Sequence, residues 1–257
     1  MATEPFAGPK LKVERAKRHM DDFKTVFRSL NNTDFVRFKL QHEGKPALYR
    51  KGGPKTFNVV LASAYKLPDD LRLIVGDSLY NLRSALDQAA SRCAVLAGKS
   101  PKRTYFPHGT DKAGFEASIA KNCKDVPIIV REAISVLEPY YGGTGFLLRA
   151  LHDLNLVDKH TDLLVYFVSM GHFSIGRGHY GFESGGLWQN GKNASELDEH
   201  FVFNSDDAVK AALTISFGGI ESIKDQPVMQ VLPQLCDLVT RTIDIIEGEC
   251  IRSGLIR

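Results

Sequence analysis

The sequence has few cysteines and no long apolar runs, and each of these absences excludes a class of protein. Its four cysteines lie far apart and form no Cys-x-x-Cys pair: Cys93, Cys123, Cys236 and Cys250. Neither a disulfide framework nor a zinc knuckle is therefore expected. No apolar run approaches the length of a membrane span, and residues 1–9 hold no apolar signal core. We expect a cytoplasmic protein without a membrane partner.

Several nucleotide-binding and catalytic motifs are also missing. The chain contains no Gly-x-Ser-x-Gly elbow, no phosphate-binding P-loop, and no Gly-x-Gly-x-x-Gly after a predicted strand. We therefore expect no nucleotide cofactor. The 33 Lys and Arg residues against 30 Asp and Glu residues leave a net charge of +3. This surplus neither requires nor excludes a nucleic-acid partner, because clustering on one face matters more than the total.

The spacing of apolar residues predicts a mainly helical α+β protein. Helical periodicity covers residues 10–30, 68–97, 126–140, 144–162 and 227–250. The clearest stripe includes Val75, Leu79, Leu82 and Leu86, which step by four and three along residues 68–97. Apolar and polar residues instead alternate over 35–41, as in a half-buried strand. Further short strands are predicted at 47–50, 57–61, 163–169, 201–203 and 213–217.

We predict one domain over residues 1–257, since no linker, repeat or low-complexity tract interrupts the chain. The predicted architecture is a bundle of four or five helices with small antiparallel β elements inserted. These elements are a β-meander near 35–62 and a Gly-rich hairpin or loop near 171–191. A chain of this length can bury a substantial core.

Two helical segments carry more polar residues than packing requires. Residues 76–87 read GDSLYNLRSALD, with Asp77 and Asn81 on one face and an i,i+4 pair of Arg83 and Asp87 on a neighbouring face. Residues 151–160 read LHDLNLVDKH. Two interpretations stand for each segment: a solvated polar helix face, or one side of a cleft between facing helices.

Together these two segments resemble a widespread group of uncharacterised bacterial proteins. The shared pattern is G-D-x-L-x-N-L-R-S-A-L-D, followed some seventy residues later by L-x-x-L-N-x-x-D-K-H, and the resemblance covers roughly residues 10–165. The group has no established activity, so the resemblance implies a bacterial origin and no particular chemistry.

A weaker resemblance is to HEPN ribonucleases, which are helical-bundle enzymes with Arg, four to six residues, and then His on one helix. This resemblance implies metal-independent RNA cleavage in a dimer cleft, with the His as acid or base and the Arg stabilising the phosphorane. Here His160 matches the His, but Asn155 stands at the Arg position and is neutral. Lys159, Arg149 or Arg83 would then have to supply the cation.

A metal site built from His152, Asp153, Asp77 and Asp87 is a further alternative, but the chain has no His-Glu-x-x-His or Glu-x-x-His motif. We therefore predict no metal and no cofactor.

The leading hypothesis is an HEPN-like protein that binds RNA or cleaves it without metal, as a homodimer. Its predicted catalytic residues are His160, Asn155, Lys159, Asp158 and Arg83. The predicted ligand-binding residues are Asp77, Asn81, Asp87 and His152. A small-molecule enzyme with a polar cleft between helices and a non-catalytic interaction protein are the alternatives.

Overall fold

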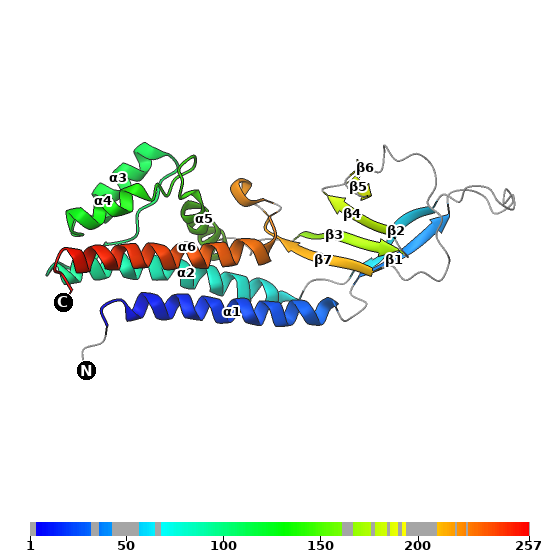
Figure 1. Cartoon of the computed structure of the whole chain (residues 1–257), viewed down its shortest axis with the longest axis horizontal. Helices are drawn as coiled ribbons and strands as arrows, with labels where there is room; N and C mark the ends of the chain where they lie inside the picture. Colours follow the sequence, from blue (N-terminus) through cyan, green and yellow to red (C-terminus); the bar gives the residue numbers. More distant parts are fainter. Residues whose placement is uncertain are drawn as a thin grey trace. The chain divides into compact units, whose positions relative to one another are not determined.

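The computed structural model describes most of the chain (Figure 1). The described residues are 4–31, 36–42, 57–64, 68–160, 167–175, 178–183, 186–189, 192–193, 210–218, 220–224 and 226–256. The described chain is mainly helical, as the sequence predicts. None of the described helices combines the length and the apolar character that a membrane crossing requires.

Contacts within the chain define two compact units. The first comprises Met1–Lys24, Asp69–Val165 and Phe217–Arg257, and the second comprises Thr25–Pro68 and Tyr166–Ser216. All the candidate site residues belong to the first unit. The single domain over residues 1–257 stays a prediction.

The first unit is built on helices. They are α1 (Ala7–Asn31, which continues beyond the unit), α2 (Asp69–Leu96), α3 (Lys112–Asn122), α4 (Ile128–Val136), α5 (Phe146–His160) and α6 (Val228–Arg252). A short 3-10 helix, Glu221–Ile223, precedes α6. Five of the six α-helices were predicted with small shifts of their ends. Helix α3 was not predicted, although Asp111 caps it by accepting a hydrogen bond from the Gly114 amide.

Helix α2 is the centre of the first unit. Its apolar stripe is fully buried, including Leu79, Leu82 and Leu86. It packs against α5 and α6, and Figure 1 shows α1, α2 and α6 side by side. Helix α1 runs antiparallel to α6, since Lys10 pairs with Glu247 and Met20 contacts Cys236. These contacts bury the apolar residues of α2 and leave polar residues of α2 facing α5 and the loop after α2.

The second unit contains the strands. β1 (Val36–His42) pairs antiparallel with β2 (Phe57–Ala64), and the register shifts between Arg37 and Phe38. Five further strands pair antiparallel in the order β6-β5-β4-β3-β7. They are β3 (Phe167–Ile175), β4 (Gly178–Glu183), β5 (Gly186–Gln189), β6 (Lys192–Asn193) and β7 (Lys210–Ser216).

Some sequence predictions fall outside the described residues. These are the strands predicted at 47–50 and 201–203, and the first part of the strand predicted at 163–169. The segment 171–191, predicted as a loose hairpin or loop, contains the end of β3 together with β4 and β5.

Candidate functional site

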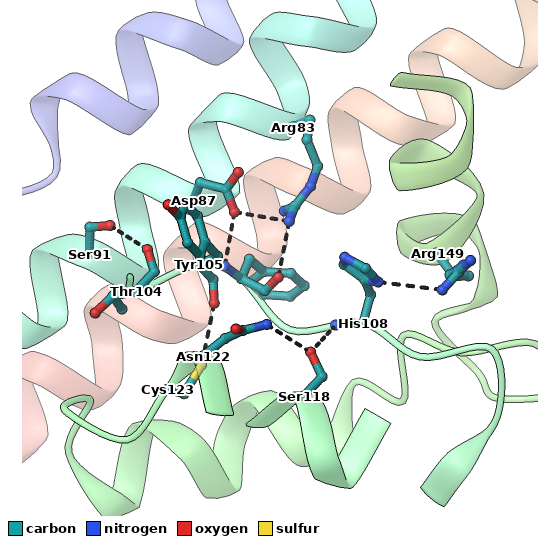
Figure 2. Close-up of polar contacts among 11 residues, drawn as sticks. Arg83, Asp87, Ser91, Thr104, Tyr105, His108, Ser118, Asn122, Cys123 and Arg149 are labelled. Carbon is teal, nitrogen blue, oxygen red and sulfur yellow. Dashed lines mark hydrogen bonds and ion pairs between the residues drawn. The ribbon is translucent and has the colours of Figure 1, made fainter. Parts of the chain in front are cut away.

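The loop that follows α2 is held against this helix by two charged side chains. Arg83 donates a hydrogen bond to the Phe106 carbonyl at 3.1 Å, and the Phe106 amide donates to Asp87 at 2.9 Å. Arg83 and Asp87 also form an ion pair at 3.0 Å (Figure 2). Arg83 is 7% exposed, so the solvated face that the sequence allowed at this position is wrong.

The buried position of this pair affects both charges. Burial raises the pKa of Asp87, and the positive charge of Arg83 opposes this rise. Burial also lowers the pKa of Arg83, while Asp87 acts against that change. Arg83, Asp87 and the Phe106 backbone thus satisfy one another's hydrogen-bonding groups. These interactions hold the loop against α2 at Phe106.

This loop carries His108 to the side of α5. The imidazole of His108 stacks on that of His152, with ring centroids 3.4 Å apart and an angle of 26° between the planes. His108 Nδ1 lies 3.4 Å from Arg149 Nη1, and Figure 2 shows the two side chains facing one another. Because a guanidinium can only donate, Nδ1 accepts this bond and the proton of neutral His108 sits on Nε2.

Both imidazoles are neutral at physiological pH. Burial lowers the pKa of His108 to about 3, with further lowering by His152, Arg83 and Arg149. Burial likewise lowers the pKa of His152 to about 4, with Arg83 as the next cause. Two rings in contact cannot both hold a proton without strong repulsion, so this pair accepts at most one.

Arg149 is fixed by a carboxylate on its own helix. It donates two hydrogen bonds to Asp153, from Nε at 2.9 Å and from Nη2 at 2.7 Å. The Tyr141 hydroxyl also donates to Asp153, and the guanidinium lies 5.4 Å from the centre of the Tyr141 ring. This bidentate arrangement leaves Nη1 of Arg149 directed at His108.

Two buried side-chain atoms of α5 have no hydrogen-bond partner in the described structure. They are Nδ1 of His152 and Oδ1 of Asn155, the latter on a residue that is 3% exposed. A buried polar atom without a partner costs about 1–3 kcal/mol. Both atoms lie on α5, and each can take up a hydrogen bond from a ligand or from water.

A second polar group lies where α1, α2 and α5 meet. Lys12 donates to Asn81 Oδ1 at 3.2 Å, and Asn81 donates to the Asp77 carbonyl at 2.7 Å. The ammonium groups of Lys12 and Lys159 lie 5.5 and 5.2 Å from the centre of the Tyr80 ring.

In the same region α2 and α5 approach closely at Gly76. A Cβ atom at this position would meet Asp158 Oδ1 at 2.5 Å. Burial raises the pKa of Asp158, and the nearby charge of Asp77 adds to this effect. The two polar motifs of the sequence therefore lie on helices that are in contact.

The structure thus distributes the predicted site residues over two groups. Arg83, Asp87 and His152 belong to the group around His108, and Asn155, whose Oδ1 has no hydrogen-bond partner in the described structure, follows His152 by three residues on α5. The second group contains the remaining described candidates, namely Asp77, Asn81, Asp158 and Lys159. His160 ends α5, and its side chain lies outside the described residues.

Sequence reasoning missed the central residue of the first group, His108. Its partners are 41 and 44 positions away in the sequence, so no periodic pattern connects them. Arg149 and Asp153 are spaced as an i,i+4 ion pair, and that signal was available.

No metal-binding group is present in the part of the chain that the structure describes, where no three His, Cys, Asp or Glu residues are arranged to hold an ion. A hollow of about 260 Å³ lies between α1 and α6, lined by residues such as Met20 and Pro233. None of the candidate residues lines this hollow.

Comparisons with protein-family models, with curated proteins and with solved structures find no match to this chain. Two neutral imidazoles in contact, with one arginine facing them and a second nearby, form an arrangement suited to proton transfer at an anionic substrate.

Proposed function

We propose that the chain is an HEPN-like protein that binds RNA and cleaves it without a metal ion. The observation that carries the proposal is the stacked pair of His108 and His152, with Arg149 3.4 Å from His108. Strongly shifted pKa values cluster at functional sites, and the pKa values of both histidines are lowered mainly by burial.

RNA offers this site both its nucleophile and its leaving group. One imidazole accepts the proton of the 2′-hydroxyl as its oxygen attacks phosphorus. The other imidazole donates a proton to the departing 5′-oxygen, and a 2′,3′-cyclic phosphate forms. Arg149 stabilises the negative charge that develops on the phosphorane, and buried Arg83 adds a favourable field.

The resting pair must gain one proton before it can act in this way. Substrate binding favours this proton uptake, because a phosphodiester anion beside the imidazoles raises their pKa. Stacking then limits the pair to a single proton, which leaves one imidazole as acid and the other as base.

This proposal differs in one respect from the motif that led to it. The HEPN-like pattern designated Asn155 and His160, whereas the described geometry favours Arg149 and His152, three positions apart on α5. His160 remains a second candidate for the base, with Lys159 and Asp158 near the substrate. We also propose that the helices form one bundle with the β elements inserted, and that the protein acts as a homodimer.

A non-catalytic interaction protein is the second candidate function. It is favoured by the mutual pairing of Arg83 with Asp87 and of Arg149 with Asp153, since paired charges of this kind can serve packing alone.

An RNA-degradation assay in the presence of EDTA tests the proposal. Single-stranded RNA should be cut by the wild type, and His152→Ala and His108→Ala should each reduce the rate by about 100-fold or more. His160→Ala in the same assay determines whether that residue takes part. Equal rates in the wild type and both variants, or no cleavage at all, would refute the proposed activity and favour the interaction protein.

A further inference from the structure

The exposed ring of Tyr80 and two lysines from neighbouring helices form a group separate from the histidine pair. Tyr80 lies on α2 and is 46% exposed. Lys12 reaches it from α1 and Lys159 reaches it from α5. Three different helices therefore contribute to one small surface.

The two ammonium groups lie against the Tyr80 ring, and the charge of Lys159 also acts on the carboxylates of Asp158 and Asp87, where it opposes the rise in pKa that burial causes. Both lie within the distance at which a cation is attracted to an aromatic ring. Among the residues that the structure describes, neither forms an ion pair with a carboxylate. Lys12 is additionally held by the amide oxygen of Asn81, which is neutral and leaves the positive charge uncompensated.

We propose that Tyr80, Lys12 and Lys159 form a subsite for one nucleotide of single-stranded RNA. The base stacks on the Tyr80 ring, and the lysines leave the ring to bind the phosphates on either side of that nucleotide. A duplex keeps its bases stacked inside, so this subsite selects unpaired RNA. The proposal rests on the proposed function for the nature of the ligand.

The position of the subsite fits a strand that continues to the histidine pair. Lys159 follows His152 by seven residues on α5, which is two helical turns and about 10 Å along the axis. Tyr80 precedes Arg83 by one turn on α2. One strand of a few nucleotides can therefore contact both groups on the same pair of helices.

Binding of a fluorescein-labelled single-stranded DNA oligonucleotide, followed by anisotropy, tests the subsite. This probe lacks the 2′-hydroxyl that the proposed cleavage requires, so its binding is measured independently of activity. The wild type should bind it more tightly than the matching duplex. Tyr80→Ala should raise Kd by about 10-fold, because one base–aromatic stack is lost. Tyr80→Phe keeps the ring and should preserve Kd.

Two further comparisons separate a binding role from a structural one. Tyr80→Leu keeps apolar bulk without an aromatic ring and should weaken binding as Tyr80→Ala does. Lys12→Ala and Lys159→Ala should each lower the slope of log K against log salt by about 0.7. Lys17→Ala, which removes a lysine paired with Glu14 from another face of α1, should leave that slope nearly unchanged.

The outcomes distinguish this proposal from the proposed function. Unchanged Kd in Tyr80→Ala and Tyr80→Leu would overturn the subsite, as would a wild type that binds neither probe. Tyr80-dependent binding without RNA cleavage would support the subsite and refute the ribonuclease. RNA cleavage with oligonucleotide binding that does not depend on Tyr80 would support the ribonuclease and overturn the subsite.

Discussion

Burial and neighbouring cations keep His108 and His152 uncharged. Both side chains are half-buried, and the pKa of each lies well below the usual value near 6.5. The cause is the loss of solvation, reinforced by the fields of Arg83 and Arg149. Each of these arginines is paired with a carboxylate, Arg83 with Asp87 and Arg149 with Asp153, and Nη1 of Arg149 lies 3.4 Å from His108.

The lowered pKa values predict how stability depends on pH. In the unfolded chain each histidine binds a proton below about pH 6.5, whereas the folded pair does so only near pH 4 and below. The neutral pair therefore makes its full contribution to the free energy of unfolding above about pH 6.5, and this contribution is lost as the pH falls towards 4. Each histidine should contribute about 1 kcal/mol to this loss at pH 5, after allowance for solvent screening.

Urea unfolding at pH 7 and pH 5 measures this dependence. The wild type should lose more stability between these pH values than His152→Gln, which has no proton to gain. An equal loss in both proteins would show that His152 does not titrate as described.

At the scale of elements, the contact between α2 and α5 depends on a residue without a side chain. Gly76 is buried in the first third of α2, and Asp158 of α5 occupies the space beside it. Replacing an exposed helical glycine by alanine usually stabilises a protein by about 0.5–1 kcal/mol. Gly76→Ala should instead give no gain or a loss, because the new methyl group meets the Asp158 carboxylate.

Two variants control this experiment. Gly248 lies in α6 with open space where a Cβ would be, so Gly248→Ala should show the usual gain. The double variant Gly76→Ala/Asp158→Ala should recover stability relative to Gly76→Ala alone. Thermal unfolding of the three proteins provides the comparison, and a full gain in Gly76→Ala would contradict the close contact.

The apolar stripe of α2 carries the packing of the first unit. Leu82 is fully buried, and Leu82→Ala should reduce the free energy of unfolding by about 2–5 kcal/mol through lost contacts and a cavity. Leu73 lies on the same helix but is 56% exposed. Leu73→Ala should change stability by less than about 0.5 kcal/mol, and similar losses in both variants would contradict this packing.

The helices were predictable because their apolar spacing reports directly on burial. The stripe through Leu79, Leu82 and Leu86 was predicted from sequence and is buried in full. Helix α3 was missed because it buries Phe115 alone, which leaves almost no periodic signal. Its start was visible only as Asp111, a capping residue that also occurs in ordinary turns.

The candidate site was predictable in its helical parts and not in its loop. The polar residues of α2 and α5 are conspicuous within apolar patterns, so Arg83, Asp87 and His152 were selected from sequence. His108 lies in an irregular segment, and its position depends on two hydrogen bonds between α2 and the Phe106 backbone, one donated by Arg83 and one accepted by Asp87. Such long-range bonds have no signature in local sequence.

At the scale of the whole molecule, the net charge of +3 is too small to attract RNA by itself. In the proposed function, RNA binds through Lys12 of α1 and Lys159 of α5, whose ammonium groups lie against the Tyr80 ring. We therefore propose that the Tyr80 subsite provides binding and that the pair of His108 and His152 provides the chemistry.

The central claim is that a phosphodiester occupies the site beside His108 and His152. The most direct test is to measure proton uptake when the ligand binds. Calorimetric titration of the uncleavable single-stranded DNA at pH 6, in two buffers of different ionisation enthalpy, gives the number of protons taken up. We expect an uptake of up to about one proton per site, because the bound anion raises the pKa of one imidazole. The double variant His108→Gln/His152→Gln should bind without uptake. Binding of the wild type with no proton uptake would contradict the account.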